Sequence, residues 1–185
     1  MPRRANVPAA YDGDVVELRS GTVELMDAAI AGEAELAAAI GHPVTPGWCS
    51  FTEALAPTRE ALAADPARAA WGVRFFLAGE PLELVGWGGF KGPPTKGVVE
   101  LGYEIAPSRQ RQGLASGAVA AMLAEAFAAA EVAMVIAHTL PEHNPSNRLL
   151  EKAGFVHEGV ADDGEEVAWR YGLTRADWAR RAGQR

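Results

Sequence analysis

The alternation of apolar and polar residues is clearest in the middle of the chain. Three consecutive segments show it with a period of two: WGVRFFLAG from Trp71, ELVGWGGFKG from Glu83 and VVELGYEIAP from Val98. This period is typical of strands with one buried face. Turn residues at Gly79–Pro81 separate the first two segments. We therefore predict three strands in an antiparallel meander.

The segment before this meander has a mainly helical pattern. A short strand is expected at Val15–Ser20, and the Ala-rich stretch Thr22–Ile40 predicts one long helix. A second helical stretch covers Phe51–Ala64. Pro57 lies near its middle and is expected to divide it into two shorter pieces, because proline lacks the amide hydrogen that a helix interior uses. These pieces would form one wall of a cleft.

The segment after the meander predicts a crossover connection. Ser116–Ala130 is strongly helical in composition, and the apolar run Val132–Thr139 is typical of a buried strand. A strand that leads through a helix into another strand implies a parallel pair. A short helix is expected at Pro145–Ala153, where Gly154 ends it.

The C-terminal part predicts a hairpin and a closing helix. Segments 155–162 and 165–173 flank Asp163-Gly164, a dipeptide common in tight turns. Thr174 is a suitable N-cap for a last helix over 174–185.

The order of these elements predicts one mixed α/β (α+β) domain over residues 1–185, with residues 1–13 mobile. A chain of 185 residues that is 49% apolar has room for one substantial core. No stretch reaches the roughly 18 apolar residues of a membrane span, so no membrane association is expected. The single cysteine, Cys49, cannot form an internal disulfide, and a cytoplasmic location is therefore expected by default.

Charge and residue spacing argue against three further classes. The formal net charge of -7 disfavours a nucleic-acid partner, because phosphate binding relies on clustered Lys and Arg. Four histidines and one cysteine offer no H-E-x-x-H or C-x-x-C spacing, so no metal site is expected. A dinucleotide-binding pattern at Gly86-Trp87-Gly88 fails because Lys91 stands where that pattern needs glycine.

A candidate phosphate site follows the third strand of the meander. That strand ends at Pro107, and an Arg/Gln/Gly loop then opens directly into the long Ala-rich helix. Unpaired N–H groups at a helix N-terminus, together with the helix dipole, stabilise a pyrophosphate. Gly113 and Ala115 allow close approach of the backbone, and Arg109 and Arg111 can add positive charge. Taken alone, this window is also compatible with a glycine that merely starts a helix.

Two motifs resemble those of the GNAT acetyltransferase superfamily. Gln110–Ala115 (QRQGLA) matches the acetyl-coenzyme A loop pattern Q/R-x-x-G-x-G/A, and Leu140–Phe155 (LPEHNPSNRLLEKAGF) resembles the fourth-motif signature E-N-x-x-S-x-R-x-L-E-K-x-G-F. The resemblance covers about residues 71–173 and is closest to the branch that includes the ribosomal-protein N-terminal acetyltransferases. It departs at His143, where the family usually has asparagine.

The resemblance implies a mostly antiparallel sheet that splays at the cofactor site, where the pantetheine arm of acetyl-coenzyme A lies like an extra strand. Backbone N–H groups near Ile105 and Ala106 would polarise the thioester carbonyl and stabilise the oxyanion. Asn144 and Asn147 are expected beside the pantetheine. The remaining cofactor contacts are expected from the loop and the first helical turn, at Gln110, Arg111, Gln112, Gly113, Leu114, Ala115 and Ser116.

Direct attack by an acceptor amine requires a general base and a proton donor. Three residues compete as the base: Glu100 and Glu104, which share one face of a strand because their separation is even, and His138 at the end of the following strand. Leu150 stands where many relatives have a tyrosine acid, which excludes such an acid there. Ser146 is the expected donor to the departing sulfur, and capping of the short helix is its alternative role.

The predicted function is transfer of an acetyl group from acetyl-coenzyme A to a primary amine, either a small molecule or a protein N-terminus. Acceptor contacts are expected from Trp48, Phe51 and acidic residues of the second helical stretch. A non-catalytic acyl-coenzyme A sensor or interaction module would show the same motifs. A pocket lined by Trp87 and Phe90 would instead suit a longer acyl donor. The sequence is compatible with a homodimer as well as with a monomer.

Overall fold

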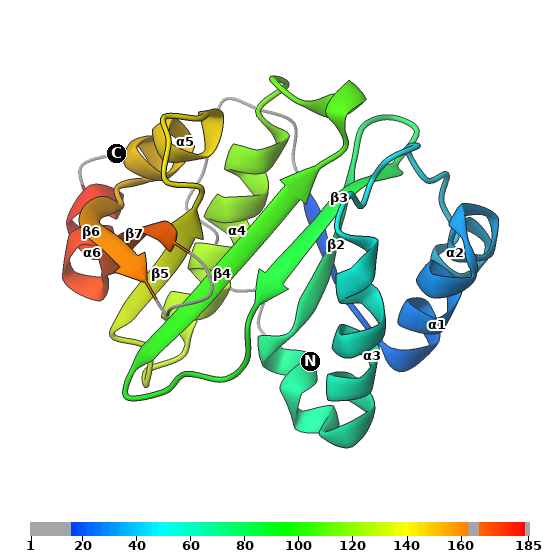
Figure 1. Ribbon diagram of the computed structural model, residues 1–185, viewed down its shortest axis with the longest axis horizontal. Helices are drawn as coiled ribbons and strands as arrows, with labels where there is room; N and C mark the ends of the chain where they lie inside the picture. Colours follow the sequence, from blue (N-terminus) through cyan, green and yellow to red (C-terminus); the bar gives the residue numbers. More distant parts are fainter. Residues whose placement is uncertain (1–15, 163–166, 184–185) are drawn as a thin grey trace.

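The computed structural model describes residues 16–162 and 167–183. Their strands form one seven-stranded sheet in the order β1-β2-β3-β4-β5-β7-β6 (Figure 1). Every neighbouring pair is antiparallel except β4 and β5, which are parallel. The strands are β1 Glu17–Ser20, β2 Val73–Ala78, β3 Glu83–Phe90, β4 Val98–Ile105, β5 Met134–Thr139, β6 Val156–Asp162 and β7 Val167–Thr174.

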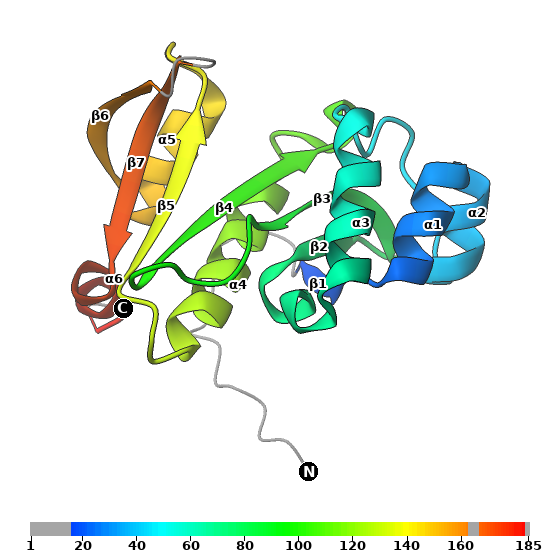
Figure 2. The same cartoon turned by 60° about the horizontal axis from the view of Figure 1, so that its bottom comes forward.

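Helices lie on both faces of this mixed α/β sheet (Figures 1 and 2). Three N-terminal helices pack against β2 and β3, and the long helix after β4 packs on the opposite face. The helices are α1 Val23–Ala31, α2 Glu33–Ile40, α3 Leu55–Ala64, α4 Leu114–Ala128, α5 Pro145–Ala153 and α6 Arg175–Ala182, with 3-10 turns η1 Thr52–Ala54, η2 Pro66–Trp71 and η3 Pro107–Arg109.

The sheet separates two hydrophobic clusters. Alternation along β2 sends Phe75 into the cluster under α1–α3 and Phe76 into the cluster under α4. Because β2 is buried along its whole length, the guanidinium of Arg74 needs internal partners. It donates to main-chain carbonyls and forms an ion pair with Glu125 at 3.1 Å. These contacts connect β2 to η2 and to α4.

The predicted meander and crossover are confirmed. β2, β3 and β4 are antiparallel neighbours, and α4 connects β4 to its parallel neighbour β5. The short helix α5 spans Pro145–Ala153, as the sequence predicts. Gly154 ends it in the left-handed conformation, with φ of 105°.

Two helix predictions are wrong in detail. Gly32 divides the stretch expected as one helix into α1 and α2, because its φ of 146° lies outside the helical range. Pro57 does not divide α3. It is the third residue of that helix, where the missing amide hydrogen leaves no intrahelical bond unmade. The change of helix type comes earlier, between Ala54 and Leu55.

The end of the chain follows the prediction. β6 and β7 form the expected antiparallel pair. The turn predicted at Asp163-Gly164 and the mobile start predicted for residues 1–13 lie outside the described residues. Thr174 caps α6 and accepts a hydrogen bond from the N–H of Asp177 at 3.1 Å. Among the described helices, none is long and apolar enough to cross a membrane.

Candidate active site

β4 and β5 pair over only three positions. Val98–Glu100 lie opposite Met134–Ile136, and beyond them the two strands diverge (Figure 2). The other edge of β4 stays paired with β3 as far as Ile105. Because backbone groups alternate between the two edges of a strand, the last residues of β4 present an edge that β5 does not cover. An extended ligand can add to such an edge.

The N-terminus of α4 opens directly beyond this gap. Gly113 is the N-cap in the left-handed conformation, with φ of 83°, and no side chain caps the helix. The first intrahelical bond runs from the N–H of Gly117 to the carbonyl of Gly113 at 3.0 Å. The N–H groups of Leu114, Ala115 and Ser116 therefore have no acceptor within the helix, which is the arrangement that favours an anion.

Side chains of the loop before α4 fix its path. Gln110 donates from Nε2 to the carbonyl of Ile105 at 3.1 Å, and Gln112 donates to the carbonyl of Ser108 at 3.3 Å. Arg109 forms an ion pair with Glu83 at 3.0 Å, so its charge is already balanced on β3. Arg111, with φ of 61°, is exposed. Of the two arginines expected to add charge, Arg111 is the one directed to solvent.

The two backbone donors expected at the end of β4 differ in the structure. The N–H of Ala106 donates to the carbonyl of Val85 at 2.9 Å, within the β3–β4 pairing. It is therefore not available to polarise a thioester, which corrects the expectation for that group. Alternation along the strand turns the backbone groups of Ile105 to the opposite edge, toward the gap. Ile105 alone keeps the expected role as a prediction.

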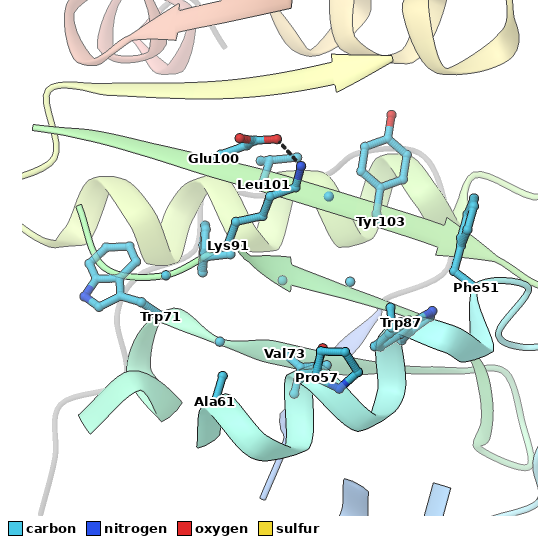
Figure 3. A pocket seen from close by; sticks show the side chains of 18 of the residues that line it. Phe51, Pro57, Ala61, Trp71, Val73, Trp87, Lys91, Glu100, Leu101 and Tyr103 are labelled. Carbon is cyan, nitrogen blue, oxygen red and sulfur yellow. Dashed lines mark ion pairs between the residues drawn. The ribbon is translucent and has the colours of Figure 1, made fainter. Parts of the chain in front are cut away.

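A cavity of about 790 Å³ lies between α3 and the strands β3 and β4 (Figure 3). All three candidate bases, Glu100, Glu104 and His138, line it. Phe51, from the segment before α3, also lines it, whereas Trp48 lies behind the wall and contacts Trp87 at 5.9 Å between ring centroids. Contacts of either residue with an acceptor stay predictions. The expected cleft wall is thus formed by η1 and α3.

Glu100 contacts two basic side chains inside this cavity. Its Oε1 lies 2.9 Å from Nδ1 of His138. It also lies 2.5 Å from Nζ of Lys91, the ion pair drawn in Figure 3. Burial raises the pKa of the Glu100 carboxyl, but the hydrogen bonds and charges of His138 and Lys91 outweigh burial and hold the pKa below its ordinary value of 4.5. A carboxylate on Nδ1 leaves Nε2 of the imidazole as the lone-pair nitrogen.

Glu104 occupies the other end of the same strand face. Its carboxylate accepts hydrogen bonds from the N–H of Ser50 at 3.1 Å, from the Ser50 hydroxyl and from Nε1 of Trp87. Burial, followed by the charge of Glu104, raises the pKa of the nearby Cys49 thiol to about 12. Cys49 therefore stays a neutral thiol at physiological pH and is unsuited to act as a nucleophile.

Ser146 meets a partner that sequence reasoning missed. Its Oγ lies 2.7 Å from the hydroxyl of Tyr103, which reaches from β4 to the N-terminus of α5. Burial raises the pKa of Tyr103 to about 12, and the bond to Ser146 offsets part of that rise. The signal available in the sequence was a tyrosine in the strand that leads into the loop. Leu150, where many relatives have tyrosine, is fully buried in the core.

Asn144 and Asn147 build the start of α5. Asn144 Oδ1 accepts from the N–H groups of Ser146 and Asn147 at 2.9 and 3.1 Å, and the side chain of Asn147 accepts from the N–H of Asn144 at 2.7 Å. Helix capping therefore belongs to Asn144, which leaves the Ser146 hydroxyl for Tyr103. Asn147 also donates to the hydroxyl of Thr139 at 2.8 Å. Contacts of these asparagines with a cofactor stay predictions.

Comparison with known proteins identifies the family. The sequence profile of the acetyltransferase (GNAT) domain matches residues 17–156. The chain belongs to the GNAT acetyltransferase family. Two Bacillus subtilis proteins are similar: the uncharacterized N-acetyltransferase YoaA, 38% identical over 42% of this chain and 45% of YoaA, and YjdG, 25% identical over 76% of this chain and 86% of YjdG. The match to YoaA thus spans less than half of that protein.

Solved GNAT structures share the fold. Mycobacterium smegmatis RimJ in complex with CoA-disulfide has a TM-score of 0.62 at 21% identity, covering 96% of this chain and 94% of that one. AAC(6')-Ib in complex with ribostamycin and coenzyme A has a TM-score of 0.63 at 21% identity, and the match covers 90% of this chain and 97% of that one. A spermidine N-acetyltransferase SpeG chimera from Vibrio cholerae and hSSAT has a TM-score of 0.66 at 17% identity, and the match covers 89% of this chain and 98% of that one. At these identities the likeness establishes the fold. Among the described residues of this chain, no group of three His, Cys, Asp or Glu side chains could hold a metal ion.

Proposed function

We propose that this GNAT protein transfers the acetyl group of acetyl-coenzyme A to a primary amine by direct attack. One observation carries the proposal: the β4–β5 gap, the uncapped N-terminus of α4 and the carboxylate-lined cavity all adjoin the second half of β4. An extended thioester ligand and an amine would therefore approach the same strand from its edge and from its face.

The residues present suit coenzyme A, which supplies an activated acetyl thioester when bound. The N–H groups of Leu114, Ala115 and Ser116 would hold the pyrophosphate, and Arg111 would add positive charge. Ile105 would donate its N–H to the thioester carbonyl oxygen from the edge of β4. Gln110 supports this placement because it fixes the loop on the carbonyl of Ile105.

The contacts favour His138 as the general base. Glu104 already accepts hydrogen bonds from Ser50 and Trp87, whereas His138 is oriented through Nδ1 by Glu100 and retains Nε2. In this assignment Glu100 positions the imidazole, and Glu104 attracts the ammonium form of the acceptor.

Ser146 is the proposed proton donor to the departing sulfur, with Tyr103 hydrogen-bonded behind it. A bond forms between the amine nitrogen and the acetyl carbon, and the carbon–sulfur bond breaks. One proton passes from the ammonium to His138 before attack, and the nitrogen loses a second proton to solvent as the amide forms. His138 then returns its proton to solvent. Ser146 gives its proton to the sulfur and regains one from Tyr103 or solvent, so the net reaction releases a thiol, an amide and one proton.

A free-thiol release assay with acetyl-coenzyme A and a panel of amines and N-terminal peptides tests the proposal, with cofactor binding measured by calorimetry. Acetyl-coenzyme A binding with amine-dependent thiol release is expected. Binding without release for any acceptor would favour the non-catalytic sensor, and absence of binding would overturn the cofactor assignment. The His138–Glu100 pair inside the cavity favours catalysis, because a sensor needs no oriented base.

A further inference from the structure

Three carboxylates line the cavity, those of Glu53, Glu100 and Glu104, and they differ in their partners and exposure. Glu100 is paired with Lys91 and lies against His138. Glu53 is exposed at the rim. Among the described residues, no ion pair involves Glu104, whose partners are the neutral donors of Ser50 and Trp87. Because Glu53 is exposed to solvent, Glu104 is the one uncompensated carboxylate of the described interior, which suits one buried ammonium group better than several.

The walls around that carboxylate are apolar. Figure 3 shows side chains from the helical side and from the strands bordering one space. Phe51 is 59% exposed although it lines the cavity, so its ring is free to cover a ligand. Trp87 is held by its bond to Glu104 and by contact with Trp48. The apolar lining includes Phe51, Pro57, Ala61, Trp71, Val73 and Trp87.

A glycine keeps the floor open between the two carboxylates. Gly102 lies midway between Glu100 and Glu104 on the same face of β4, and a Cβ placed on it would meet no atom within 4 Å. Gly89 stands opposite Gly102 in the β3–β4 pairing, so that part of the floor is backbone alone. The open space thus begins beside Glu104 and continues between the apolar walls.

We infer that the acceptor is a primary amine with a single positive charge carried on one apolar body, such as an alkyl chain or an aromatic ring. This inference rests on the proposed function and specifies its substrate class. The ammonium lies over Gly102 beside Glu104, and the apolar body extends along Phe51, Pro57 and Val73. A polyamine or aminoglycoside would bury further charges against apolar walls, where the only other unpaired carboxylate of the described lining is Glu53 at the solvent-exposed rim.

The test is a comparison of kcat/KM among amines. From n-butylamine to n-hexylamine, kcat/KM is expected to rise about fourfold per methylene, because each methylene leaves water for an apolar wall. Phenethylamine should match or exceed n-hexylamine. Spermidine and kanamycin should be about tenfold poorer or worse, because their extra charges lose water without gaining partners. A higher kcat/KM for spermidine, kanamycin or an Ala- or Ser-initiated peptide than for n-hexylamine would overturn the inference.

Two variants localise the effect to this cavity. Gly102→Leu places a side chain in the open space and should reduce kcat/KM for n-hexylamine at least about tenfold, with the melting temperature and acetyl-coenzyme A affinity unchanged. Phe51→Ala should weaken the dependence of kcat/KM on the chain length of the amine. Ile30→Ala, which truncates a 48% exposed side chain on α1, is the control and should leave that dependence unchanged. Unchanged amine kinetics in Gly102→Leu would contradict the placement.

Binding separates failure of this inference from failure of the proposed function. If no amine is turned over, calorimetry with saturating coenzyme A still compares n-hexylamine with spermidine. Tighter binding of n-hexylamine would support the substrate class although acetyl transfer had failed. Equal or weaker binding of n-hexylamine would overturn the substrate class itself.

Discussion

The cofactor loop can be tested by a pair of substitutions at Gly113 that differ only in charge. Gly113 adopts φ of 83°, a conformation that Asn and Asp tolerate better than other side chains. Gly113→Asn and Gly113→Asp should therefore cost similar conformational free energy. The aspartate alone places a negative charge next to the N–H groups of α4 that would hold the pyrophosphate.

The size of the effect follows from Coulomb's law. A carboxylate about 5.5 Å from one phosphate charge, at an effective dielectric constant of about 20, is repelled by roughly 3 kcal/mol. This corresponds to about 100-fold weaker binding. The penalty should shrink as salt is raised from about 0.1 M to about 1 M, because the screening length falls from about 10 Å to about 3 Å.

Calorimetric titration of acetyl-coenzyme A into the unmodified protein and both variants measures this difference. Gly113→Asn is expected to stay within a few-fold of the unmodified affinity, and Gly113→Asp to lose about 100-fold at low salt. Gly41→Asp is the matched control, because Gly41 is also left-handed, with φ of 79°, but ends α2 far along the chain from the loop. Equal affinity of the Asp and Asn variants of Gly113 would refute the reasoning.

Three further substitutions probe the reaction and its pH dependence. Ser146→Ala should lower kcat about tenfold with little change in cofactor affinity, measured by thiol release, and an unchanged kcat would remove Ser146 from the mechanism. Tyr103→Phe should lower kcat about fivefold through the lost bond to Ser146. The pKa of Tyr103 is about 12 in the folded protein and 10.0 ordinarily, so the free energy of unfolding should decline as the pH rises from 10 to 12. In Tyr103→Phe, alkaline denaturation should lack this contribution to the decline. Glu100 has a lowered folded pKa, so its contribution to stability is present above pH 4.5 and lost as pH falls through the folded pKa. Glu100→Gln should flatten acid denaturation there and lower kcat more than it changes KM, and an acid profile like that of the unmodified protein would contradict the His138 pairing.

Local sequence signals predicted the elements of the second half well. α5 begins at Pro145 and ends before Gly154 as expected, since a proline in the first turn, an Asn cap and a left-handed glycine act within a few residues. The break at Gly32 was missed because an Ala-rich stretch scores as helix on both sides of it, and its φ of 146° depends on how α1 and α2 pack.

Contacts between strands were beyond a single sequence because they depend on register. The sequence placed Glu100 and His138 on neighbouring strands, but the third partner, Lys91, follows from the β3–β4 pairing that brings the carbonyl of Glu100 to the N–H of Lys91. The bond between Tyr103 and Ser146 likewise needs the position of α5 relative to β4. No local pattern encodes either distance.

The same register explains why the acceptor class becomes readable only in the folded chain. Along the sequence, Gly102 is one of many glycines, and Glu100 and Glu104 are equivalent carboxylates on one strand face. In the sheet, Lys91 neutralises Glu100 but not Glu104, and Gly89 opposite Gly102 leaves the floor bare between them. The asymmetry between the two carboxylates decides where a single ammonium group is stabilised. Selectivity toward apolar amines would therefore arise from strand pairing. Removing the charge of Lys91 should alter this selectivity more than removing the charge of Glu53.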